Sequence, residues 1–180
     1  MENQKVKFSQ SFTFKGLINI MGFLFSKKPK KVDNDFFGTM ELKRNNGQYF
    51  FVCYRQFAPV NDMVETLLVG RGLDISGVET HKQEAFFKKI ESNYSQICQT
   101  LAPRIERAIQ TKIEGFRIRD FHNEFKINFL CLPTCNETPL DWVIQFDFHD
   151  KSSAVDGIAL VLADNKVIDV SLYDAGWGKK

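Results

Sequence analysis

The sequence predicts an α+β fold, in which an antiparallel sheet packs against a long, amphipathic, Pro-kinked helical segment. Three features indicate it: a two-residue turn signal between strand-like segments, a helical stripe of apolar residues, and alternating apolar residues in the last third. The predicted order is β-β-β-α-α-β-β-β-β. Strands grouped on either side of helices are typical of α+β domains. At 180 residues and 43% hydrophobic, the chain can bury one sizeable core.

The first three predicted strands cover residues 37–43, 48–57 and 63–69. Asn46 and Gly47 form the residue pair that two-residue hairpin turns favour, because both positions need a left-handed backbone. Counting outward from this turn pairs Leu42 with Phe51 on the face expected to be buried.

The helical segment begins at Thr80, which with Gln83 has the spacing of a capping box. One apolar stripe then recurs at helical spacing. Its members are Phe86, Phe87, Ile90, Tyr94, Ile97, Cys98 and Leu101. Pro103 is expected either to kink this helix or to open a second one.

The last four predicted strands cover residues 124–132, 141–149, 158–163 and 166–172. Asp164 and Asn165 tolerate the backbone of a tight turn and predict a closing hairpin. Alternation in the first of these strands predicts that four side chains face the core together. They are Phe125, Ile127, Phe129 and Cys131.

Residues 1–36 look unlike the remainder, so we expect a basic, flexible or loosely packed leader followed by one domain over residues 37–180. Residues 1–31 hold seven Lys and one Glu. The apolar run at 17–25 is far shorter than the ~20 residues of a membrane-spanning helix. Two interpretations stay open: residues 17–31 contact a membrane surface, or Met21 is the natural start.

The rest of the chain carries 17 Lys and Arg against 21 Asp and Glu. An acidic body is not typical of nucleic-acid-binding folds, so no nucleic acid is expected as partner. The four cysteines lack the close, even spacing of a small secreted disulfide protein, which indicates free thiols and a cytoplasmic location.

No catalytic motif is present, which favours a binding role over an enzymatic one. The enzymatic alternative is a hydrolase or small-ligand protein with a dispersed site. Its candidates are Glu124, Asp147 and His149, of which the last two lie about 7 Å apart on one strand face. Cys131 and Cys135, with His122 and His149 nearby in sequence, provide too few ligands to predict a metal site. No cofactor is expected.

For a binding role, we expect the partner to contact outward polar residues and the tryptophan near the C-terminus. These residues are Asp141, Gln145, Asp147, His149, Asp174 and Trp177. A set rich in aspartate would attract a basic protein partner and raise its association rate.

Three stretches, residues 37–57, 80–87 and 161–168, give the chain a pattern that resembles small uncharacterised bacterial α+β proteins of the immunity-protein type. The resemblance covers most of residues 37–174 and rests on architecture, so no functional residue is carried over. It implies a bacterial, cytoplasmic protein that neutralises a secreted toxin by binding it.

Overall fold

The computed structural model describes residues 30–45, 48–69, 80–135, 140–149 and 155–173. They form eight strands and two helices. In chain order these are β1 (Lys30–Asn34), β2 (Gly38–Asn45), β3 (Gln48–Phe57), β4 (Asp62–Val69), α2 (Thr80–Gln110), α3 (Phe121–Glu124), β5 (Phe125–Leu132), β6 (Asp141–Phe148), β7 (Gly157–Ala163) and β8 (Lys166–Tyr173). The α+β class predicted from the sequence is confirmed.

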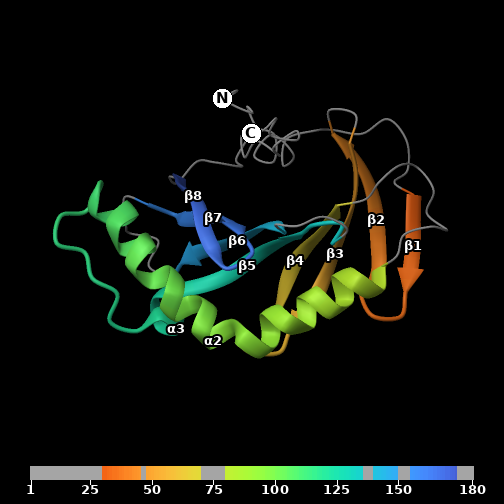
Figure 1. Ribbon diagram of the computed structural model, residues 1–180, viewed down its shortest axis with the longest axis horizontal. Helices are drawn as coiled ribbons and strands as arrows, with labels where there is room; N and C mark the ends of the chain where they lie inside the picture. Colours follow the sequence, from red (N-terminus) through yellow and green to blue (C-terminus); the bar gives the residue numbers. More distant parts are fainter. Residues whose placement is uncertain (1–29, 46–47, 70–79, 136–139, 150–154, 174–180) are drawn as a thin grey trace, which may run out of the picture.

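All eight strands lie in one sheet, in the order in which they occur along the chain. Every neighbouring pair is antiparallel except β4 and β5, which run parallel from Glu65 beside Phe129 to Leu68 beside Leu132. Parallel neighbours need a crossover connection, and α2 lies within this one. Figure 1 shows α2 crossing the row of strands along one face of the sheet.

The main core lies between α2 and this face. Eight side chains of α2 are buried: Gln83, Phe87, Ile90, Tyr94, Cys98, Leu101, Ile105 and Ile109. The ring of Phe87 meets those of Phe37 and Phe57 edge to face, with centroids 6.0 and 5.7 Å apart. Such arrangements place the positive edge of one ring against the negative face of another. The abundant phenylalanine therefore fills the layer between helix and sheet.

The hairpin of β2 and β3 has the predicted register, with Leu42 opposite Phe51. The turn residues Asn46 and Gly47 lie outside the described residues. In the closing hairpin of β7 and β8, Asp164 has a positive φ of 51°. Aspartate tolerates this backbone conformation better than most residues, which is why the sequence signal located the turn correctly.

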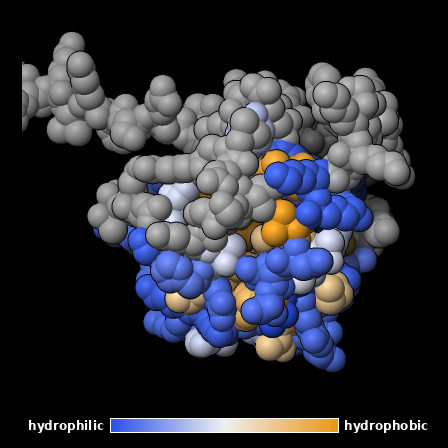
Figure 2. All heavy atoms as spheres, turned by 90° about the vertical axis from the view of Figure 1, so that its right-hand side faces the viewer, coloured by the Kyte–Doolittle hydropathy of each residue, from blue (hydrophilic) through white to orange (hydrophobic). Residues whose placement is uncertain are grey.

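The predicted element order is wrong by one strand, because four strands precede α2. Strand β1 lies within the stretch expected to be a leader, and it pairs with β2 from Lys30 opposite Leu42 to Asn34 opposite Gly38. As an edge strand it is short and lysine-rich, a composition that opposes pairing with another chain. Figure 2 faces this end of the molecule, where hydrophilic side chains dominate the coloured surface.

The predicted second helix after Pro103 is also wrong. Pro103 lies inside α2, which continues to Gln110, and the second helix is the single turn α3. Proline removes one helical hydrogen bond, but Pro103 is exposed, so the carbonyl that loses its partner can be hydrated. The predicted kink stays a prediction.

The prediction that Phe129 and Cys131 of β5 face the main core is wrong. The pairing of β5 with β6 shifts register between Ile127 and Phe129. A bulge at this point reverses the alternation, so Leu130 joins Phe125 and Ile127 in the main core. Phe129 and Cys131 instead face the opposite side of the sheet.

On that opposite side, a second apolar cluster contains Phe50, Val52, Leu67, Cys131 and Val143, each at most 7% exposed. None of the residues of α2 or α3 belongs to it. The sheet is therefore apolar on both faces at its centre.

Candidate functional site

A polar cluster lies on the face of the sheet away from α2, where β5, β6 and β8 supply its members. The carboxylate oxygen Oδ1 of Asp147 accepts hydrogen bonds from Asn128 Nδ2 and Tyr173 Oη, each 2.6 Å away. Gln145 Nε2 donates in turn to Tyr173 Oη over 2.9 Å. Asn128 comes from β5, next to β6. Tyr173 lies two strands from Asp147, and its ring crosses over Gly157 of β7, which pairs with both residues and has no side chain in the way.

The hydroxyl of Tyr173 is a hydrogen-bond donor within this cluster. Burial raises the pKa of the Tyr173 hydroxyl well above its usual value, and the adjacent Asp147 raises it further. The hydroxyl therefore stays protonated and acts as a donor, because ionisation would place a second negative charge beside Asp147. Two of the predicted partner-binding residues, Gln145 and Asp147, thus bond to neighbours in their own sheet.

The three residues predicted for an acid–base site, Glu124, Asp147 and His149, do not bond to one another through their side chains in the structure. Glu124 Oε1 accepts hydrogen bonds from the backbone N–H groups of Arg119 and Asp120, 2.7 and 2.8 Å away, and so holds the loop before α3. His149 is exposed, and its backbone N–H donates to the carbonyl of Glu124 over 3.0 Å. Among the described residues, the carboxylate of Asp147 is bonded by Tyr173 and Asn128, not by His149.

The other residues predicted to bind a partner do not lie together on the surface that the structure describes. Asp141 is exposed at the start of β6, while Asp174 and Trp177 lie outside the described residues. The exposed members that are described, Asp141 and His149, therefore lie near opposite ends of one strand. They do not form a single patch.

Cys131 and Cys135, which are close in sequence, lie in different environments. Cys131 is buried in the second apolar cluster, whereas Cys135 is half-buried and its thiol donates to the carbonyl of Pro133 over 3.4 Å. In the described part of the chain, no three His, Cys, Asp or Glu side chains come close enough to hold a metal ion. The spacing of Cys131 and Cys135 reflects a strand end and the loop that follows it.

A groove beside α2 is the feature that sequence reasoning missed. It has a volume of about 170 Å³ and lies between the helix and the ends of β6 and β7. Trp142 forms part of its wall, fixed by an edge-to-face contact with Phe86 and a 2.7 Å hydrogen bond from Nε1 to the carbonyl of Asp164. The apolar lining consists of Phe86, Ile90, Ile97, Leu101, Trp142 and Leu162.

The rim of the groove is polar, and among the described residues it carries a single charged side chain. It consists of Lys89, Asn93, Gln96, Thr100 and Asn165. Amide and hydroxyl groups can hydrogen-bond to a passing backbone, but they provide neither a general base nor a nucleophile with an adjacent base. This lining can bind a ligand. Among its described residues the only acid–base group is the amine of Lys89, which has no carboxylate or imidazole beside it in the lining.

The size of the groove limits what it can hold. Sites for cofactors and drug-sized molecules enclose roughly 300–1,000 Å³, whereas a cavity of roughly 150 Å³ accommodates a benzene ring. At about 170 Å³, the groove fits one aromatic ring or one branched aliphatic side chain.

A sequence signal for the groove did exist. Phe86 and Ile97 belong to the predicted apolar stripe, yet both are only half-buried, while Phe87 and Cys98 beside them are buried. The apolar stripe is thus wider than the contact between helix and sheet, and its outer margin forms the groove wall.

No family model matches the chain, and neither a curated protein nor a solved structure similar to it was found. Neither helix in the described part of the chain is both long and apolar enough to span a membrane.

Proposed function

We propose that this protein acts by binding another protein, and that the groove beside α2 receives one bulky apolar side chain of the partner. The observation that carries the proposal is the size and lining of this groove. A pocket of about 170 Å³ with an apolar wall and a polar rim matches an anchor pocket, in which a single buried residue provides much of the binding energy.

The position of Trp142 supports this role. Its ring is 2% exposed and is held by Phe86 and the carbonyl of Asp164, so it presents a rigid wall to an incoming side chain. A preformed pocket loses little conformational entropy on binding. The rim amide of Gln96 is exposed and can bond to the backbone on either side of the anchor. Asn93 is also exposed, but its Nδ2 donates to the carbonyl of Lys89 over 2.8 Å, so its amide oxygen is the group that can accept from that backbone.

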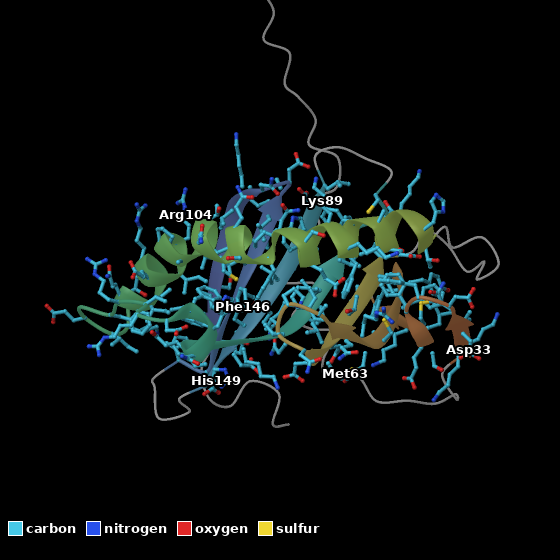
Figure 3. The ribbon with its side chains drawn as sticks, turned by 90° about the horizontal axis from the view of Figure 1, so that it is seen from below. Asp33, Met63, Lys89, Arg104, Phe146 and His149 are labelled. Carbon is cyan, nitrogen blue, oxygen red and sulfur yellow. The ribbon has the colours of Figure 1, made fainter. Side chains whose placement is uncertain are left out.

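Site-specific photocrosslinking in cells of the source organism tests the proposal. A photoreactive residue replaces Gln96 at the groove rim or, as control, Met63, which is 53% exposed. Figure 3 shows Met63 far from the side of α2 that bears Lys89. We expect a discrete protein adduct from position 96 and none of the same mass from position 63.

A groove-filling variant makes this result specific. Thr100→Trp places an indole over the groove and should remove the adduct, whereas Ser95→Trp adds the same side chain on another flank of α2 and should retain it. Both positions are exposed, so both variants should fold, as circular dichroism will check. Absence of an adduct at position 96, or its persistence in Thr100→Trp, would contradict the proposal.

The more specific proposal is an immunity protein that neutralises a basic toxin. It is supported by the acidic composition of residues 32–180 and by the resemblance of the strand and helix pattern, while the groove itself supports only protein binding. Co-expression with the product of each neighbouring gene tests it. Restored growth in the presence of a toxic neighbour would support this role, and the absence of any toxic neighbour would contradict it.

A further inference from the structure

The side of α2 that borders the groove carries positive charge and no acid. At 100° per residue, six positions fall within an arc of about 80° on the helix surface. They are Lys89, Asn93, Gln96, Thr100, Arg104 and Arg107, and all six are exposed. We call this set the cationic stripe. Figure 3 shows Lys89 and Arg104 along the same side of the helix.

The acids of α2 lie on its other flank and are engaged there. Glu84 pairs with Lys88 at 2.6 Å, and Glu91 accepts a hydrogen bond from the backbone N–H of Ala58 over 2.9 Å. Glu106 pairs with Arg117 at 3.1 Å. None of these carboxylates is therefore directed at the cationic stripe.

The charges of the stripe itself are not neutralised within the described residues. No ion pair there involves Lys89, Arg104 or Arg107. Two acids directly precede groove residues of the sheet. Asp164 accepts a hydrogen bond from the backbone N–H of Leu140 over 3.1 Å, and Asp141 alternates with Trp142 along β6, so it lies on the face of the sheet away from α2. Three cations with no acid between them favour a negatively charged ligand along this side of the helix.

From these observations we infer that the partner docks through an acidic segment, which places one bulky apolar side chain in the groove and carboxylates against Arg104 and Arg107. This inference rests on the proposed function and adds the chemistry of the partner. It differs from the expectation that acidic composition selects a basic partner, because the surface beside the anchor pocket is locally cationic.

The geometry of α2 also sets the spacing within that segment. The groove is centred near Asn93, and Arg104 lies 11 residues further along the helix. At ~1.5 Å per residue this is about 16 Å, which an extended segment spans in about five residues. Carboxylates four to six residues from the anchor would therefore reach Arg104 and Arg107.

A nucleic acid is the other anionic partner to consider. Its phosphates recur about every 3.4 Å along one strand and favour a dense row of cations. In the stripe, Lys89 and Arg104 are separated by three uncharged polar residues and about 22 Å of helix. The apolar groove between them fits a side chain better than a sugar–phosphate backbone.

Peptide display on the full-length chain tests the inference. A random 16-residue library is selected on the protein and counter-selected on Thr100→Trp, and peptide affinities are then measured at low salt and in 0.3 M NaCl. We expect selected peptides to carry a bulky apolar residue with acids four to six positions away. Arg104→Glu/Arg107→Glu should weaken binding about tenfold, since exposed charge pairs each contribute modestly.

Lys112→Glu/Arg119→Glu is the matched control, because it changes the net charge equally at exposed positions outside the stripe. One outcome would overturn the inference and leave the proposed function intact. It is a set of peptides that do not bind Thr100→Trp, but that either lack acidic residues or bind Arg104→Glu/Arg107→Glu as tightly as the wild type. Failure to obtain any peptide that depends on the groove would overturn both. A labelled single-stranded 20-mer oligonucleotide that needs both arginines and binds Thr100→Trp normally would also overturn it, in favour of nucleic acid.

Discussion

Gln83 joins the two parallel strands at the centre of the sheet through the carbonyl of Pro133, which lies 50 residues away along the chain. Its Nε2 donates to Pro133 over 2.9 Å and to the carbonyl of Val69 over 3.1 Å. Val69 ends β4, and Pro133 directly follows β5. The first turn of α2 thus holds together the only parallel pair among the described strands.

We expect Gln83→Ala to lower the free energy of unfolding by about 2 kcal/mol. The substitution removes two hydrogen bonds and leaves two partly buried carbonyls without their donor, at about 1 kcal/mol each. Urea unfolding followed by circular dichroism measures the change. Gln96→Ala, at an exposed position of the same helix, should be within about 0.5 kcal/mol of the wild type.

Gly157→Ala is expected to destabilise the fold by more than about 2 kcal/mol through overpacking. A Cβ at Gly157 would lie closer than 3.0 Å to Oη and Cζ of Tyr173 and 2.5 Å from the carbonyl oxygen of Phe146. Adding Tyr173→Phe removes Oη but neither of the other two contacts. The double variant should therefore unfold at no higher urea concentration than Gly157→Ala, and recovery of stability would contradict this view of the site.

The sequence located most strands because their apolar residues alternate, and it failed where alternation is broken. A bulge has no side-chain signature of its own, so the shift after Ile127 could not be read from residues that look apolar on both sides of it. Strand β1 was missed for the opposite reason. Its sequence, Lys-Lys-Val-Asp-Asn, has one apolar residue and is held by pairing with β2.

The groove could not be predicted because its walls come from segments far apart in the chain. Ile97 on α2, Trp142 on β6 and Leu162 on β7 meet only once the sheet is assembled. The helical stripe indicates that these α2 residues are apolar, but not that the sheet leaves some of them uncovered. Pocket formation is a property of packing between elements, and no short motif encodes it.

Tyr173→Phe is expected to lower the free energy of unfolding by about 1–2 kcal/mol, because it removes a hydrogen bond to a partly buried carboxylate. The hydroxyl of Tyr54 provides a matched control. It donates to Glu65 over 3.1 Å, but Tyr54 is 63% exposed. Tyr54→Phe should change stability by less than about 0.5 kcal/mol. Equal costs for the two substitutions would show that the cluster around Asp147 adds no more than a surface contact.

The four thiols should differ sharply in reactivity. Burial raises the pKa of Cys53, Cys98 and Cys131 from 9.0 to about 12. The thiolate is the reactive form, and at pH 8 these three side chains are protonated as well as inaccessible. With a thiol reagent in excess, Cys135 should react first in the native protein. The other three should react only at the rate of unfolding, as mass spectrometry of labelled peptides will show.

The same thiols make stability depend on alkaline pH. An unfolded cysteine loses its proton near pH 9, whereas these folded ones keep it to about pH 12. Between those values the native state binds more protons than the unfolded state, so the free energy of unfolding falls as pH rises. Each thiol contributes a slope of up to about 1.4 kcal/mol per pH unit.

Urea titrations of the wild type and of Cys131→Ala between pH 8 and pH 10.5 isolate one of these contributions. The variant is expected to be less stable at pH 8, because it leaves a small cavity in the second apolar cluster. Its stability should then fall less steeply with pH, since one buried thiol no longer titrates on unfolding. Other ionisable groups affect both proteins equally and cancel in the difference, so parallel pH profiles would show that Cys131 is not held protonated by the fold.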